Sequence, residues 1–386
     1  MVPAAERWQA NRSGERPEDG GTVVVYSGNA QRSPCDHENA TYCEIARQLA
    51  AIKGFAYGGL FDASCAYAGP LYFVPSDTFV TLASARTLGI HAEQHLFGGV
   101  VPYPFIATKT ITHALPASGA KAPPGWSFEL AQRVRDVVLP GYSAFSIDDA
   151  RDAGMALLRH GALRVKMASG IGGLGQWVVA DSAELDACLQ ALDAQEVARD
   201  GLVCECNLAQ VETLSVGQVR VGDLLATYCG TQRLTTNNAG EEVYGGSDLV
   251  VARGDFDALL RLALAPAALE AIAQARAYHA AVLQAYPGMF ASRCNYDVAQ
   301  GCDEAGRRYS GVLEQSWRIG GASGAEVAAL AAFRADAALD AVRASTMEIY
   351  GADAHVPANA ILHFQGVDER AGPITKYSTL APHADP

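Results

Sequence analysis

The sequence predicts a mixed fold: a small parallel α/β domain at the N-terminus, followed by two α+β subdomains. Three observations lead to this expectation. Strand and helix patterns alternate over residues 22–97, as they do in parallel α/β units. A glycine-rich loop joins two strand patterns within residues 163–179, between two capped helix patterns. Two further strand patterns within residues 290–318 form a long hairpin with a polar face.

The composition is that of a globular protein large enough for several subdomains. The chain has 386 residues, of which 49% are hydrophobic and 18% charged. Its net charge of −13 argues against nucleic acid or an anionic membrane as the main partner. Because no apolar run reaches membrane-spanning length and the first residues lack an apolar export segment, we expect a cytoplasmic protein. The sequence does not indicate the oligomeric state.

The N-terminal domain and its linker are predicted to extend over residues 21–125. Residues 1–20 are polar and rich in glycine, arginine and glutamate, which indicates a disordered tail. The cluster from Cys35 to Glu38 offers metal ligands, but such a short cluster is more often a loop or a helix cap. The elements expected are strands at 22–27 and 71–74, a helix at 38–53, and helical stretches at 84–88 and 93–97.

Residues 126–200 are predicted to form a compact, lid-like α+β subdomain. Ser146 and Asp149 form a capping pair at the start of one helix, and Asp181 and Glu184 cap a second one. Two strands and the glycine-rich loop lie between these helices, so the order helix, strand, strand, helix is expected.

The glycine-rich loop follows a strand that carries Lys166. Four glycines fall within Gly170–Gly175, and glycine allows the backbone to approach a ligand closely with its N–H groups free. A lysine at the strand end together with such a loop is typical of a phosphate site. A tight β-turn that needs glycine is the simpler alternative. A dinucleotide fingerprint is a further rival, although a strand rather than a helix follows, and no Gly-Lys-Ser/Thr closes a Walker A loop.

Residues 201–370 are predicted to form a larger, strand-rich subdomain, followed by a polar tail at 371–386. Helices are interrupted by Pro266 and stopped by the pair Pro287-Gly288. The elements expected are strands at 202–208, 213–221, 224–228 and 232–235, two helices within 256–286, a hairpin at 290–318, a long helix at 324–349 and a strand at 360–364.

The hairpin places two sets of polar side chains on one face, because side chains alternate along a strand. They are Arg293, Asn295 and Asp297 from the first strand, and Glu314, Ser316 and Arg318 from the second. A turn centred between Ala305 and Gly306 would set Asp297 directly opposite Glu314. Opposed carboxylates repel each other in a sheet, but they become favourable around a cation such as Mg²⁺. An exposed polar face with Arg–Asp pairs is the alternative.

These residues resemble the ATP-grasp superfamily, in which two α+β subdomains hold ATP between them. The resemblance covers Lys109 to Arg318, and it implies that a small α/β domain precedes a two-subdomain ATP-grasp fold. The roles it implies are contacts to phosphate by Lys109, Lys166, Ser169, Gly172 and Gly173, recognition of adenine by Glu205 and Leu208, and recognition of ribose by Glu212.

The resemblance also implies a metal site and a reaction. Asp297, Glu314 and Ser316 would hold Mg²⁺ or Mn²⁺, although the superfamily motif is Glu-x-Asn and this chain has Ser316. Arg318 would contact phosphate or the reacting acyl group. Arg293 flanks the same polar face, and we expect it to be a second catalytic arginine that offers donors to phosphate or carboxylate. The N–H groups at Ser323 and Gly324 offer a weaker candidate site for a substrate carboxylate, whose alternative is a plain helix-entry loop.

The function implied is an ATP-dependent ligase that joins a small-molecule carboxylate to an amine, or less often a thiol. Two other functions remain open. Ser316 in place of asparagine favours a kinase-like or regulatory ATP-binding protein on the same fold. The glycines of residues 170–175 leave a nicotinamide-dependent oxidoreductase as a third hypothesis.

Overall fold

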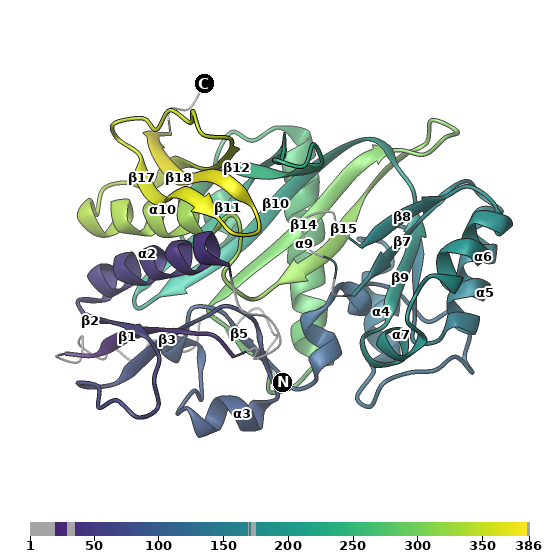
Figure 1. Ribbon diagram of the computed structural model, residues 1–386, viewed down its shortest axis with the longest axis horizontal. Coiled ribbons are helices and arrows are strands. Elements are labelled where there is room, and N and C mark those ends of the chain that lie inside the picture. Colours follow the sequence, from purple (N-terminus) through teal and green to yellow (C-terminus); the bar gives the residue numbers. More distant parts are fainter. Residues whose placement is uncertain (1–19, 29–34, 169, 171–174, 384–386) are drawn as a thin grey trace.

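The computed structural model describes residues 20–28, 35–168, 170 and 175–383. Within these ranges the strands form four sheets, of which the largest has eight strands. Figure 1 shows the small N-terminal sheet, the large central sheet and the lid-like unit side by side. The tail expected at residues 1–20 lies almost wholly outside the described residues.

The N-terminal sheet is parallel, as predicted from the alternation of strands and helices. β1 (Thr22–Tyr26) lies between β2 (Ala56–Leu60) and β3 (Leu71–Pro75), and α2 (Asp36–Lys53) packs on it. β2 contains two adjacent glycines and was not predicted. The segments after β3 are β4 (Phe79–Val80), α3 (Leu82–Thr87), η1 (Glu93–His95), β5 (Gly99–Val101), η2 (Pro104–Ala107) and η3 (Lys109–Thr112).

The cluster from Cys35 to Glu38 forms the start of α2. The Glu38 carboxylate accepts the Cys35 backbone N–H, which gives a capping box. Ligand atoms of Cys35, His37 and Asp368 lie within 4.8 Å of one another. However, Asp368 already accepts the His37 backbone N–H and two backbone N–H groups of the turn after β17. Capping and turn formation therefore account for this cluster.

The lid-like unit has a four-stranded sheet with helices beside it. The Ser146 side chain caps α5, and the Asp181 side chain caps α6, as the sequence predicted. The strand order is β6-β9-β7-β8, so β7, which carries Lys166, lies inside the sheet. The elements are α4 (Phe128–Val134), β6 (Gly141–Ala144), α5 (Ile147–Leu158), β7 (Leu163–Met167), β8 (Gln176–Val179), α6 (Ser182–Gln190), α7 (Ala194–Asp200) and β9 (Leu202–Cys206).

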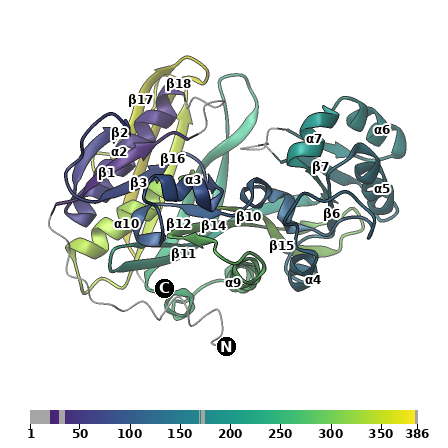
Figure 2. The ribbon, with the colours of Figure 1, turned by 90° about the horizontal axis from the view of Figure 1, so that it is seen from below.

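The large sheet is antiparallel, with the strand order β15-β14-β10-β11-β12-β16-β18-β17. Figure 2 shows α9 crossing beneath this sheet. None of the helices in the described ranges has the length and apolar character needed to cross a bilayer. The elements are β10 (Ala209–Val221), β11 (Leu224–Thr236), β12 (Glu242–Arg253), α8 (Phe256–Leu259), α9 (Pro266–Ala285), β13 (Phe290–Ala291), β14 (Arg293–Cys302), β15 (Arg308–Ser316), α10 (Ser323–Ala335), β16 (Ala341–Tyr350), β17 (Ile361–Asp368) and β18 (Gly372–Pro382).

The long helix predicted over 324–349 is wrong. α10 ends at Ala335, because Asp336 adopts an extended backbone with φ −130° and ψ 108°. After it, Val342 and Ala344 are buried while Arg343 is exposed, which is the period-two pattern of β16. An alanine-rich composition without a glycine or proline between the two elements concealed the change of period.

Two other expectations differ from the structure. The strands predicted at 224–228 and 232–235 are one continuous strand, β11. The polar tail predicted at 371–386 contains β18, whose Ile374, Tyr377 and Ser378 are buried between β16 and β17. Here a sequence of mixed polarity fits a strand that is paired on both edges.

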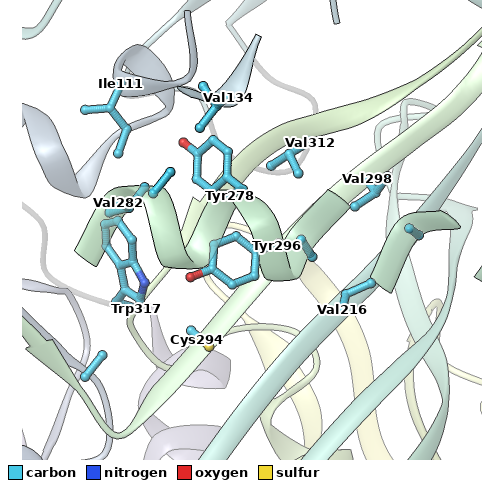
Figure 3. Packing of buried hydrophobic residues seen from close by; sticks show 14 of the residues in the cluster. Ile111, Val134, Val216, Tyr278, Val282, Cys294, Tyr296, Val298, Val312 and Trp317 are labelled. Atoms are coloured by element: carbon cyan, nitrogen blue, oxygen red, sulfur yellow. The ribbon is translucent and has the colours of Figure 1, made fainter. Parts of the chain in front are cut away.

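A large apolar core joins α9 to the central sheet. Figure 3 shows Tyr278 and Val282 of α9 facing Tyr296, Val298 and Val312 of the sheet. Fully burying a side chain of this size contributes about 2 kcal/mol relative to leaving it in water. This core fixes β14 and β15 against the helix, and so fixes the hairpin that carries the predicted site.

We predict that the buried His279 makes the fold sensitive to acid. Burial lowers the pKa of His279 from 6.5 to about 4, and its Nδ1 lies 2.6 Å from the Tyr296 hydroxyl. Because the unfolded state then binds a proton more readily, stability present above pH 6.5 falls as the pH drops towards 4, by up to about 3 kcal/mol. Urea unfolding at pH 7 and pH 5 should show a smaller loss for His279→Gln than for the wild type. Equal losses in both proteins would contradict this assignment.

Candidate functional site

Two carboxylates face each other across the β14–β15 hairpin. Asp297 pairs with Glu314 and Asn295 pairs with Ser316, so the register predicted for this face is confirmed. Near the turn, Cys302 pairs with Arg308, which centres the turn on Ala305 rather than after it. A bulge between the two regions shifts the register by one residue and restores the predicted pairs.

Asp297 is held by donors on one of its two oxygens. Gln232 Nε2 and Asn295 Nδ2 each lie 2.8 Å from Asp297 Oδ1, and the Ser215 hydroxyl lies 3.4 Å from the same atom. Burial, and then the negative charge of Glu314, raise the pKa of Asp297 to about 6. Among the described residues, the second carboxylate oxygen of Asp297 accepts no hydrogen bond, so it is available beside Glu314.

Glu314 is paired with a lysine that comes from a different part of the fold. Lys109 Nζ, at the start of η3, lies 2.9 Å from Glu314 Oε2 and donates to the carbonyl of Gly170 over 2.8 Å. Burial acts to raise the pKa of Glu314, but the charges of Lys109, Lys166 and Arg318 lower it below its usual value. The glycine-rich loop, the hairpin and three cations thus meet in one place.

Lys166 belongs to a buried triad. Its ammonium group forms an ion pair with Glu205 on β9, and Glu205 also contacts His113 Nε2 at 3.3 Å. Burial acts to raise the pKa of Glu205, but Lys166 and His113 lower it to about 2. The Glu205 carboxylate, expected to recognise adenine, is therefore already bound to the lysine expected to contact phosphate.

Leu208 contributes to an apolar cluster beside this triad. It packs with Leu139 and Ala299, and partly buried side chains of Cys206, Tyr309 and Leu313 pack against them. Such a surface suits the flat face of an aromatic ring. Glu212 is exposed on β10, two strands away from β15 in the sheet.

Only the two ends of the glycine-rich loop belong to the described part of the chain. The predicted phosphate contacts Ser169, Gly172 and Gly173 lie outside it. Gly175 has a φ of +70°, a conformation that favours glycine, and its carbonyl accepts the backbone N–H of Met167. A glycine at this position fits both the phosphate site and the tight β-turn that the sequence suggests.

Arg293 does not present its guanidinium as a free donor. It is buried and paired with Glu326 on α10, through Nε to Oε2 over 3.0 Å and Nη2 to Oε1 over 2.7 Å. Its Nη1 also donates to the carbonyls of Ser316 and Arg318, the latter over 2.5 Å. The expectation that Arg293 contacts a ligand therefore does not fit, and Arg293 instead positions the segment that carries Arg318.

The remaining predicted residues have mixed outcomes. The Ser316 hydroxyl accepts an N–H of Arg293 over 3.3 Å. Arg318 is partly exposed and donates through Nη1 to the carbonyl of Ile319. Ser323 is fully buried and its hydroxyl accepts the backbone N–H of Gly320 over 3.0 Å, while Gly324 packs against His363. The start of α10 is thus shaped by its own hydrogen bonds, which favours a helix-entry loop.

Several residues of the site were not singled out from the sequence. These residues lie on the first turn of α10, on β11 or just after η3, and they are far along the chain from the residues that they contact. They are His113, Tyr228, Gln232 and Glu326. Asn295 was placed on the polar face but given no role. Only the pairing of strands and helices brings these residues together, so no local pattern could identify them.

The residues present fit a divalent cation. Asp297 and Glu314 oppose each other on neighbouring strands, and burial together with the negative charge of Glu314 raises the pKa of Asp297. A cation between two such carboxylates relieves this repulsion, and carboxylate oxygens are preferred ligands of Mg²⁺ and Mn²⁺. The third residue predicted, Ser316, is a weaker candidate because its hydroxyl is already an acceptor for Arg293.

Comparison with solved structures identifies the fold. Biotin carboxylase from Campylobacter jejuni matches with a TM-score of 0.50 and 10% identity over 94% of this chain and 87% of that chain. Carboxyaminoimidazole ribonucleotide synthase from Aspergillus clavatus, complexed with ATP, gives a TM-score of 0.49 and 13% identity over 94% of both chains. The first of these likenesses shows the ATP-grasp fold, as the resemblance implied.

The chain also matches a protein family over most of its length. No curated protein matches the sequence. Residues 24–378 match the model of the family described as protein of unknown function (DUF3182), and the chain belongs to this family.

Proposed function

We propose that the protein is an ATP-dependent ligase that activates a carboxylate as an acyl phosphate for attack by an amine or, less often, a thiol. One observation carries this proposal. Two lysines, Lys109 of η3 and Lys166 of β7, converge with the opposed carboxylates Asp297 and Glu314. The ATP-grasp fold supports it, because the biotin carboxylase with this fold was solved as a complex with a form of ATP.

The proposed nucleotide lies between the lid-like unit and the hairpin. Its phosphates contact Lys109 and Lys166, and its adenine packs on the apolar cluster around Leu208. Glu212 is the candidate for the ribose hydroxyls. Asp297 and Glu314 hold Mg²⁺ or Mn²⁺, which supplies charge neutralisation at the phosphate oxygens when bound.

The proposed reaction has two steps. A substrate carboxylate oxygen forms a bond to the γ-phosphorus while the bond from that phosphorus to the β-phosphate oxygen breaks, which releases ADP. The amine nitrogen then forms a bond to the acyl carbon, the carbon–oxygen bond to phosphate breaks, and the amine loses a proton. Both steps move negative charge between oxygens, so cations placed around them stabilise the transition states. Lys166 and Arg318 supply this charge from the protein.

A second function, a kinase-like or regulatory ATP-binding protein, is favoured by Ser316. Its hydroxyl is short and already accepts an N–H of Arg293, so this position adds little to a metal site. Such a protein would bind ATP and Mg²⁺ without activating a carboxylate for ligation. Whether ADP release depends on a carboxylate substrate separates the two functions.

We predict that Asp297→Asn removes the stabilisation that a divalent cation gives. The variant loses one of two opposed charges, so its Tm without cation should rise by roughly 2 °C. Mn²⁺ or Mg²⁺ with ADP should then give no further shift, whereas the wild type should be stabilised by mass action. Glu304→Gln, in the exposed turn of the same hairpin, should behave like the wild type. A cation-induced shift in Asp297→Asn equal to that of the wild type would refute the metal assignment.

We predict that Lys166 contributes strongly to ATP affinity. The double variant Lys166→Met with Glu205→Gln removes both charges of the buried pair and leaves neither uncompensated. Its ATP affinity should fall at least about tenfold, the effect expected for a lost charged hydrogen bond. Quenching of Trp177, which is 41% exposed on β8, measures the affinity.

Two comparisons complete that experiment. Lys121→Met, at an exposed position, should leave the ATP affinity unchanged. Titration of the wild type with NADH tests the nicotinamide-dependent oxidoreductase. Tighter binding of NADH than of ATP, or an unchanged ATP affinity in the double variant, would count against the proposed function.

We predict that ADP release depends on a carboxylate substrate. Panels of amino acids, dipeptides and small organic acids, each with Mg²⁺ and ATP, should include at least one that raises ADP release severalfold. Hydroxylamine added with that acid should trap its acyl phosphate as a hydroxamate, which a colorimetric iron assay detects. ADP release that needs no carboxylate and gives no hydroxamate would instead favour the kinase-like or regulatory protein.

A further inference from the structure

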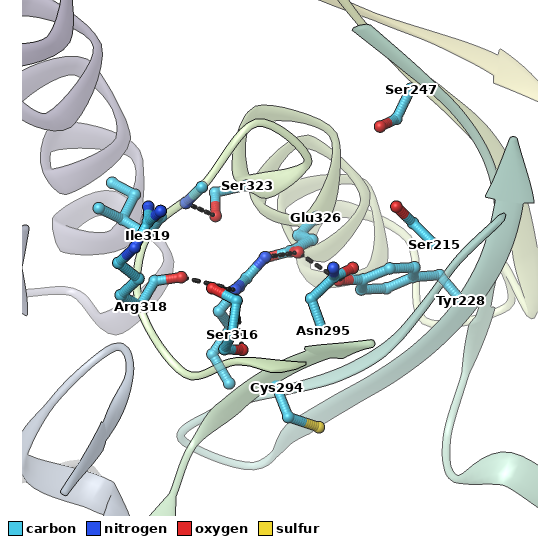
Figure 4. Close-up of polar contacts among 12 residues, drawn as sticks. Ser215, Tyr228, Ser247, Cys294, Asn295, Ser316, Arg318, Ile319, Ser323 and Glu326 are labelled. Atoms are coloured by element: carbon cyan, nitrogen blue, oxygen red, sulfur yellow. Dashed lines mark hydrogen bonds and ion pairs between the residues drawn. The ribbon is translucent and has the colours of Figure 1, made fainter. Parts of the chain in front are cut away.

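A series of three polar side chains, Glu326, Tyr228 and Asn295, leads from α10 to the carboxylate of Asp297. Figure 4 shows Glu326 and Tyr228 pointing towards each other and towards Asn295. Glu326 is fully buried, and each of its two carboxylate oxygens accepts an N–H of the Arg293 guanidinium. Asn295 in turn lies beside Asp297.

This series of side chains has one hydrogen-bond donor too few. The Tyr228 hydroxyl lies 2.5 Å from Glu326 Oε1 and 2.9 Å from Asn295 Oδ1, yet it has a single proton. A carboxylate paired with a guanidinium is a stronger acceptor than an amide oxygen, so Tyr228 donates this proton to Glu326. The contact between Tyr228 and Asn295 then joins two oxygens without a proton.

Exchanging the positions of the nitrogen and oxygen in the Asn295 side-chain amide does not supply the missing donor. It only moves the contact without a proton from Tyr228 to Asp297. The amide nitrogen would then face Tyr228 and donate to its oxygen. The amide oxygen would instead face Asp297 Oδ1, from which the terminal amide atom lies 2.8 Å. Two oxygens without a proton then meet at the metal site, which is unfavourable unless a cation lies beside them.

Asp297 does not need Asn295 as a donor. Gln232 Nε2 lies 2.8 Å from the same Asp297 oxygen, and the Ser215 hydroxyl also contacts it. The N–H of Asn295 can therefore leave Asp297 without leaving that carboxylate unpaired. No comparable substitute donor among the described residues supports the Tyr228 side of Asn295.

We propose that Asn295 is a third protein ligand of the divalent cation, with its amide oxygen on the cation and its amide N–H on Tyr228. This inference rests on the proposed function, because it assumes the cation at Asp297 and Glu314. In this arrangement each contact in the series from Glu326 to Asp297 is bridged either by a proton or by the cation. The amide ligand then comes from β14, directly opposite Ser316 on β15.

Mn²⁺ binding measured by electron paramagnetic resonance tests this proposal. The titration uses Mn²⁺ alone and Mn²⁺ with ADP at pH 8, where both carboxylates are ionised. Asn295→Leu should weaken Mn²⁺ binding at least tenfold, and Asn295→Asp should keep it within about threefold of the wild type. Gln232→Leu is the matched control, because it removes a donor to Asp297 but no proposed ligand, and it should weaken binding less than Asn295→Leu.

A spectroscopic variant reports contact with the cation directly. In Asn295→Cys, Cd²⁺ should give a thiolate-to-metal charge-transfer band in the ultraviolet, measured as a difference from the wild type with its own cysteines. Equal weakening by Asn295→Leu and Gln232→Leu, together with no such band, would overturn the role of Asn295 and leave the proposed function intact. A wild type that binds no Mn²⁺ even with ADP would overturn both.

Discussion

The repulsion between Asp297 and Glu314 is the constraint to which the rest of this site is adjusted. Strand pairing forces the two carboxylates together, and the buried core beneath the hairpin prevents them from moving apart. Hydrogen-bond donors stabilise one oxygen of Asp297, and an ion pair with Lys109 stabilises Glu314. Such a pair is costly for the fold alone, and sites that keep unfavourable charges in place are commonly functional.

The buried pair of Arg293 and Glu326 extends this constraint into the fold. Removing either partner would leave a charge in the core at a cost of about 3–5 kcal/mol. In return, Arg293 holds the carbonyls of Ser316 and Arg318, and Glu326 holds Tyr228. One ion pair therefore connects the first turn of α10 with both strands of the hairpin, so the position of Arg318 depends on a helix outside the hairpin.

Local periodicity was enough to predict part of the site. The face shared by Asp297 and Glu314 was predictable because a strand alternates and a short turn fixes its partner. The helix at 324–349 was wrong because the alanines within residues 337–344 favour a helix, and only tertiary packing overrides that preference. Glu326 has the position of an ordinary first-turn acid, and His113 lies in an irregular segment. Their partners are separated from them by tens of residues, so their roles depend on the tertiary structure alone.

The charge pairing also determines how nucleotide and cation would interact with each other. Without ligands, Lys109 neutralises Glu314 and Lys166 neutralises Glu205, so neither lysine is an unpaired cation. A phosphate that draws Lys109 away exposes the charge of Glu314, and a divalent cation compensates that charge. Binding of either ligand would therefore lower the free-energy cost of binding the other. This is positive coupling between the two binding equilibria, and thermodynamic linkage makes it reciprocal. In a chain of net charge −13, this exchange would let the proposed nucleotide, an anion, bind without a permanent excess of positive charge at the site.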